Sequence, residues 1–97
     1  MIRVIVEREF EEPADFGALQ EREDGFAWCL DQHRVRFIRS YFSKDRKLMV
    51  CEYEAPDAEA VREIHRQTGL PYVRLWTARL FDWEAEGLGE RTPKDER

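Results

Sequence analysis

The chain has 97 residues, the size of one small domain, and a domain of this size buries only about two-thirds of the surface of its unfolded chain. Hydrophobic residues make up 42% and charged residues 38%, a globular composition that excludes global disorder. The net charge is −5, with basic residues scattered among acidic ones, which disfavours nucleic acids and anionic membranes as partners. Two cysteines, with no signal peptide and no bilayer-spanning apolar run, predict a reducing cytoplasm.

The first third of the chain predicts a strand followed by a helix. Residues 2–10 alternate with period two, which is typical of a strand with one face on a core. Ile2, Val4 and Val6 share one face, and Arg3, Ile5, Glu7 and Glu9 share the other. Pro13 and Asp15 then mark a turn and a helix start. Apolar residues at helical spacing predict a helix over residues 16–32, with Gly25 as a point of weakness or kinking.

The middle of the chain predicts a hairpin. Residues 35–43 and 47–54 read as strands, and a two-residue turn at Asp45 and Arg46 would join them. That turn fixes the register: Arg39 opposite Glu52, Tyr41 opposite Val50, and Ile38 opposite Tyr53. The opposite charges of Arg39 and Glu52 favour this pairing, since cross-strand ion pairs stabilise a sheet.

A second helix and a last strand complete the predicted domain. Asp57 is a good N-cap for a helix that ends near Thr68, where Gly69 and Pro71 give a stop signal. Residues 72–82 read as the last strand. The order is strand, helix, strand, strand, helix, strand, which predicts an α+β, ferredoxin-like βαββαβ sandwich. We expect this domain to span residues 1–83 and a charged, flexible tail to span residues 84–97.

Several segments, in this order and spacing, resemble a family of small bacterial nickel-binding-protein-like domains that was long catalogued only as a domain of unknown function. They are Val6 to Phe10, Ser40-Tyr41-Phe42-Ser43 with Asp45, Cys51 to Arg62, and Gly69-Leu70-Pro71. The resemblance covers roughly residues 4–80. It implies a ferredoxin-like fold, dimerisation through the sheets and a possible nickel cofactor, but it transfers no metal ligand residue by residue.

The face of the sheet away from the helices is the first candidate site. The predicted register and the placing of charges away from the core put these residues there: Ile5, Glu7, Glu9, Phe37, Arg39, Tyr41, Leu48, Val50, Glu52, Glu54, Arg74 and Trp76. Such a mixture of large apolar groups and charges indicates a homodimer interface. It also fits a small-ligand pocket between sheet and partner. Glu7 or Glu52, flanked by apolar groups, would then be a catalytic acid or base with a raised pKa, although pairing of Glu52 with Arg39 is the simpler interpretation.

Metal binding is the second candidate. The histidines are His33, which we expect at a solvated helix end, and His65, which we expect half-buried on the second helix. Antiparallel helices would place these two histidines far apart. His65 is the best nickel ligand, because imidazole suits Ni²⁺ and because Glu9 and Asp45 lie at the same end of the sheet. Cys29 and Cys51 read as small buried hydrophobes, reduced and not bonded to each other.

Three classes of function remain open. The first is a ligand- or metal-binding homodimer, supported mainly by the resemblance. The second is a cofactor-independent enzyme of the dimeric α/β-barrel type, such as a monooxygenase or isomerase, which the architecture permits by analogy alone. The third is a structural or regulatory interaction domain. The sequence shows no Ser-His-Asp arrangement and no glycine-rich phosphate loop.

Overall fold

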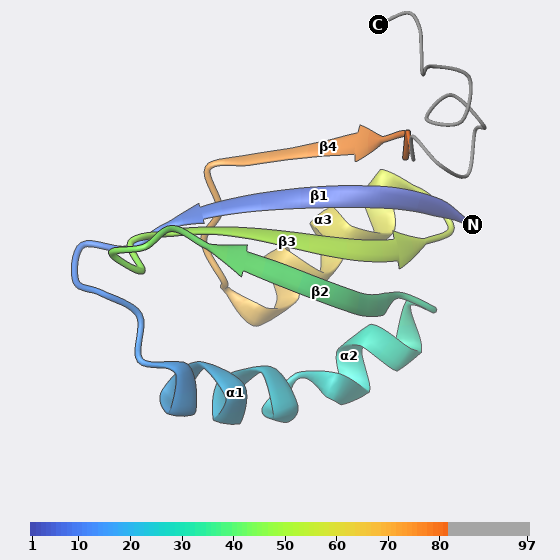
Figure 1. Ribbon diagram of the computed structural model, residues 1–97. Coiled ribbons are helices and arrows are strands. Elements are labelled where there is room, and N and C mark those ends of the chain that lie inside the picture. Colours follow the sequence, from blue (N-terminus) through green and yellow to red (C-terminus); the bar gives the residue numbers. More distant parts are fainter. Residues whose placement is uncertain (82–97) are drawn as a thin grey trace, which may run out of the picture.

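The computed structural model describes residues 1–81 and shows one four-stranded antiparallel sheet with helices on one face (Figure 1). The elements are β1 (Ile2–Glu9), α1 (Phe16–Gly25), α2 (Ala27–Gln32), β2 (Arg36–Phe42), β3 (Leu48–Ala55), α3 (Ala58–Thr68) and β4 (Arg74–Ala78). The strand order β2-β3-β1-β4 is compatible with the predicted ferredoxin-like arrangement. The predicted tail lies outside the described residues.

The predicted first helix is two helices. α1 ends at Gly25 and α2 begins at Ala27, with Phe26 in a non-helical conformation between them. Glycine at this point gives the chain conformational freedom at a cost to helix stability. The break lies where the sequence indicated weakness. Among residues 1–81 there are thus three helices, and none is long and apolar enough to cross a membrane.

Local capping explains where the helices begin and end. The Asp15 carboxylate accepts hydrogen bonds from the backbone N–H groups of Gly17 and Ala18, at 3.0 and 3.2 Å. Asp57 caps α3 in the same way by accepting from the Ala60 N–H at 2.8 Å. Gly69 ends α3 with a left-handed φ of 74° and donates its N–H to the His65 carbonyl.

The β2–β3 hairpin keeps the predicted register near its turn and changes it farther away. Arg39 pairs with Glu52 and Tyr41 with Val50, as predicted. The predicted pairing of Ile38 with Tyr53 is wrong, because a bulge shifts the register and pairs Phe37 with Tyr53. Since paired residues share a face, Phe37 turns to the helix-covered side, and its ring lies 5.6 Å from that of Tyr53. The assignment of Phe37 to the open face is therefore corrected.

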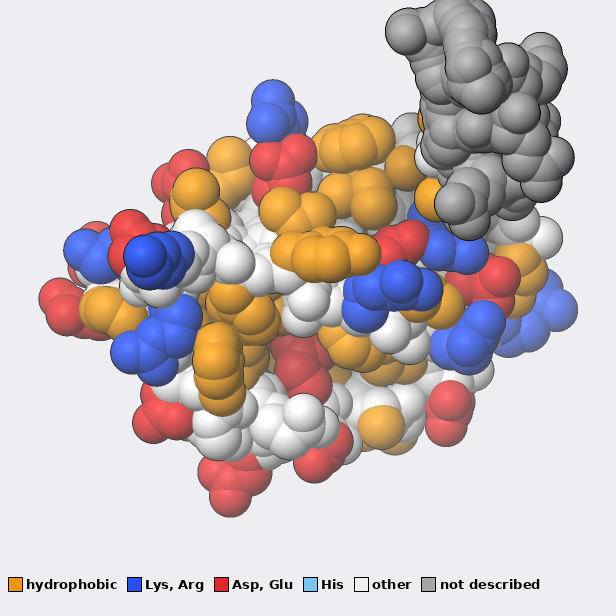
Figure 2. All heavy atoms as spheres, in the orientation of Figure 1, with side chains coloured by type: hydrophobic (Ala, Val, Ile, Leu, Met, Phe, Trp, Pro, Cys, Tyr) orange, Lys and Arg blue, Asp and Glu red, His pale blue; other side chains and the backbone are white. Residues whose placement is uncertain are grey.

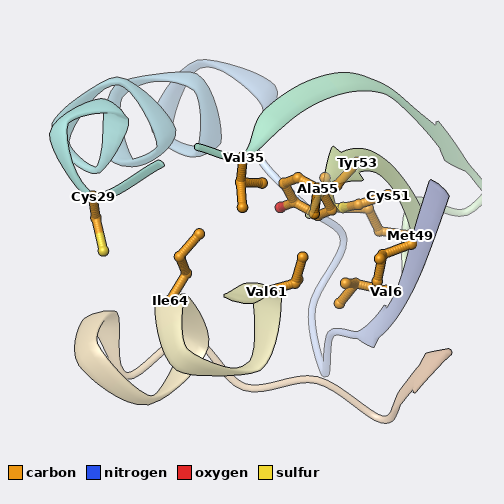
Figure 3. Close-up of a cluster of buried hydrophobic side chains, with 10 residues drawn as sticks. Val6, Cys29, Val35, Met49, Cys51, Tyr53, Ala55, Val61 and Ile64 are labelled. Atoms are coloured by element: carbon orange, nitrogen blue, oxygen red, sulfur yellow. The ribbon is translucent and has the colours of Figure 1, made fainter. Parts of the chain in front are cut away.

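The core lies between the sheet and the helices (Figure 3). β1 and β3 contribute alternate residues, as a half-buried antiparallel sheet requires. α2 and α3 contribute Cys29, Val61 and Ile64. Both cysteines are buried and free, as predicted. One charged side chain, Arg8, continues the buried face of β1 beyond Val4 and Val6 and is only 4% exposed.

Candidate functional site

The open face of the sheet carries two carboxylates, and each is held by two donor side chains from neighbouring strands. Glu52 pairs with Arg39, with a 3.3 Å separation between Oε1 and Nε, and also with Arg3 on β1. Glu7 on β1 accepts hydrogen bonds from Arg74 at 2.9 Å and from the Trp76 indole N–H at 2.7 Å, both on β4. The structure thus gathers five of the predicted open-face residues into two clusters, Glu52 with Arg39 and Glu7 with Arg74 and Trp76.

The electrostatics of Glu7 differ from the expectation. Hydrogen bonds from Arg74 and then Trp76 lower the pKa of Glu7, whereas a catalytic acid would need a raised pKa. Glu7 and Arg74 border, with Leu75 and Trp76, a surface depression of about 390 Å³. The carboxylate is therefore held ionised beside a guanidinium, an arrangement that ties β1 to β4 but does not favour proton transfer.

Large apolar groups stand exposed on the same face. Tyr41 is 59% exposed, Leu48 51% and Trp76 45%. They lie on three different strands, β2, β3 and β4. A patch of this kind is typical of an interaction surface.

A buried polar cluster lies on the opposite, helix-covered face. The Arg8 guanidinium donates to Glu23 on α1 at 3.1 Å and to the Tyr53 hydroxyl on β3 at 3.3 Å. It also lies 3.1 Å from Nε2 of His65 on α3, while its own Nε has no hydrogen-bond partner. Sequence reasoning missed this cluster. The signal was present, because Arg8 continues the period-two alternation of Val4 and Val6 and must therefore face the core.

Both ring nitrogens of His65 are engaged in this cluster. Arginine can only donate, so Nε2 accepts from Arg8, and Nδ1 carries the proton that it donates to the Val61 carbonyl at 2.9 Å. Burial lowers the pKa of His65 and keeps the ring neutral. His65 is only 4% exposed, so it is buried and not half-buried as expected.

The structure does not bring the predicted nickel ligands His65, Glu9 and Asp45 together. Glu9 follows Arg8 in β1, so its side chain points to the other face of the sheet from His65. Asp45 is bound within the hairpin loop, where it accepts hydrogen bonds from Ser43 Oγ at 2.6 Å and from the Lys47 N–H. Within residues 1–81, no three His, Cys, Asp or Glu side chains gather closely enough to hold a metal as they stand.

A different pair of soft or borderline ligands does converge, between α2 and α3. The Cys29 thiol lies 3.2 Å and His33 Nε2 lies 3.3 Å from the same atom, Gln67 Oε1. His33 therefore lies against the last turns of α3, the helix that carries His65. The expectation that the C-terminal ends of these helices lie far apart is wrong. Gln67 Nε2 in turn donates to Glu63 at 3.4 Å. Burial, and then the nearby Glu63 carboxylate, raise the pKa of the Cys29 thiol.

The spacing explains this convergence. Cys29 and His33 are four residues apart on α2 and its C-cap, and Glu63 and Gln67 are four residues apart on α3. Residues at this spacing lie one above the other on a helix face. Two such pairs face each other across the α2–α3 contact. The sequence carried this signal as the Cys29-to-His33 spacing, but nothing in it indicated that Glu63 and Gln67 would face that pair.

Comparisons with known proteins agree with the fold and identify the family. A profile of the family described as nickel responsive protein SCO4226-like matches residues 5–77. The crystal structure of SCO4226 from Streptomyces coelicolor A3(2) superposes with a TM-score of 0.71 at 16% identity, covering 82% of this chain and 99% of that one. Among curated proteins, none matches this chain. The family that the sequence resembled is thus confirmed, and the chain belongs to the SCO4226-like family of nickel-responsive proteins.

Proposed function

We propose that this protein binds nickel between α2 and α3, through Cys29 and His33. The carrying observation is that the Cys29 thiol and the His33 imidazole meet at one atom, Gln67 Oε1, at 3.2 and 3.3 Å. Imidazole and thiolate are both suited to Ni²⁺, and membership in a family described as nickel-responsive favours this metal over others. Glu63, next to Gln67, is the carboxylate that would join them.

The donor set fits a metal after two side-chain movements, of Gln67 and of Glu63. Gln67 is exposed, so its side chain can leave the point of convergence without disturbing the core. Turning Glu63 toward that point would supply the third protein ligand that transition-metal sites usually require. Nickel would hold α2 against α3 there. Binding must displace the proton of Cys29, whose pKa is raised, so affinity should fall as the pH is lowered.

We further propose that the protein works in the cytoplasm as a homodimer that pairs through the open sheet face. The exposed Tyr41, Leu48 and Trp76 support this association, since burying them removes a large apolar patch from water. The ion pairs around Glu7 and Glu52 would lie in the same interface. No observation in residues 1–81 favours the monooxygenase or isomerase alternative.

Calorimetric titration with Ni²⁺ tests the nickel proposal. Cys29→Ser and His33→Ala should each lower the affinity by at least about tenfold, the low end of the loss seen even for residues that only support a ligand. His65→Gln is the matched control, because it removes the other histidine while leaving Cys29 and His33 in place. A loss of affinity in the His65 variant alone would move the site to His65, and a wild type that binds no nickel would overturn the proposal.

A further inference from the structure

A cavity of about 340 Å³ lies between the α1–α2 pair and β2, away from both the nickel proposal and the open face. Most of its wall is apolar: Phe16, Leu19, Ala27, Leu30, Phe37, Phe42 and Met49. Figure 2 shows a hollow below the middle of the face in view, where an acidic side chain is recessed between hydrophobic ones. Phe16 is 51% and Phe37 40% exposed, so both large rings at this cavity are partly open to solvent.

The polar part of the wall is acidic. It consists of Gln20, Glu23, Asp24 and Ser40, and within residues 1–81 no Lys, Arg or His lines the cavity. Arg46 lies over the Phe16 ring, 5.6 Å from its centroid, but it donates to the Ala14 carbonyl and does not line the cavity. A ligand in the cavity therefore meets carboxylates and aromatic rings, and both favour a cation.

Glu23 is the anchored member of this acidic wall. Its Oε2 accepts a hydrogen bond from Arg8 at 3.1 Å, and Arg8 is only 4% exposed and is itself held by Tyr53 and His65. The core thus fixes Oε2, and because Oε1 accepts no hydrogen bond within residues 1–81, we assign Oε1 to a group in the cavity. A side chain that is held from behind and lines a largely apolar cavity is a preorganised polar contact.

We propose that this cavity binds a small amphiphilic cation, an amine with an aromatic or branched apolar body, whose ammonium group donates to Glu23. The volume lies at the lower end of the range for small-molecule sites, so the ligand is about the size of an arylalkylamine. The apolar body fills the space between α1 and β2. The charge preference is for cation over neutral over anion.

Nuclear magnetic resonance titration with phenethylamine tests the site, with phenethyl alcohol and phenylacetate as neutral and anionic probes of similar shape. We expect saturable shifts of the backbone amides of the lining residues, with phenethylamine the tightest binder. Phenylacetate binding as tightly as the amine would overturn the charge argument. The absence of saturable shifts with all three probes would overturn the site.

Two variants separate the cavity from its charge. Ala27→Phe fills the cavity from α2 without touching Arg8, and should abolish the shifts. Glu23→Gln should weaken phenethylamine by about tenfold or more, as expected for losing a charged hydrogen-bond partner, while phenethyl alcohol should change less. Glu21→Gln, exposed on the same helix, is the control and should bind as the wild type does. Undiminished binding in a folded Ala27→Phe variant would overturn the proposal.

Discussion

The ion pair between Arg8 and Glu23 should be a major determinant of stability, and Glu23→Gln measures it. The substitution keeps the shape of the side chain but leaves a guanidinium that is 4% exposed without its carboxylate. Removing one partner of a buried pair costs about 3–5 kcal/mol. The Glu23 side chain is 23% exposed, so water can partly solvate the guanidinium once the carboxylate is gone. We therefore expect the free energy of unfolding to fall by about 2–3 kcal/mol.

Urea unfolding followed by circular dichroism at fixed protein concentration gives this loss directly. Glu21→Gln, an exposed neighbour on α1, should change the free energy of unfolding by less than about 0.5 kcal/mol. The double variant Arg8→Met/Glu23→Gln should lose at least about 1 kcal/mol less than the sum of the two single variants, because the residues contact each other. Additive losses, or a Glu23→Gln variant as stable as the wild type, would refute the coupling.

Three further predictions follow from other parts of the structure. Burial lowers the pKa of His65, so the unfolded chain binds a proton more readily than the folded one, and stability should fall as the pH drops below about 6.5. When unfolding is compared at neutral and mildly acidic pH, this pH dependence of stability should be weaker in His65→Gln. An unchanged pH dependence would contradict the buried, neutral state of His65. Tyr41→Asp or Val50→Asp should dissociate the proposed dimer in light scattering, since a charge buried without a partner costs several kcal/mol; a wild type that is monomeric at micromolar concentration would refute that interface. Both thiols should react with a thiol reagent after denaturation without reductant, and if neither does, they are not free.

The sequence predicted the elements well because their signals are local. Asp57 and Gly69 cap α3 through contacts with nearby backbone, so the local sequence is enough to locate the ends of the helix. Gly25 marked the break between α1 and α2. Register near the hairpin turn was predictable for the same reason, since turn geometry fixes which residues face each other.

Features that depend on tertiary packing were harder to predict. The bulge at Ile38 inserts one residue into β2, and no glycine or proline in the strand indicates it. The bulge places Phe37 on the cavity wall and not on the open face. Likewise, the sequence places Cys29 and His33 on one helix face but does not show how α3 lies against that face. The contacts of Cys29 and His33 with Gln67 depend on how α2 and α3 pack together, and they join residues more than thirty positions apart in the sequence.

X-ray absorption at the nickel edge, measured on the wild type loaded with Ni²⁺, tests the central claim most directly. A site built on Cys29 and His33 places sulfur together with imidazole nitrogen in the coordination shell, and the sulfur signal should disappear in Cys29→Ser. A shell of nitrogen and oxygen alone in the wild type, or a sulfur signal that persists in Cys29→Ser, would contradict the proposed site between α2 and α3.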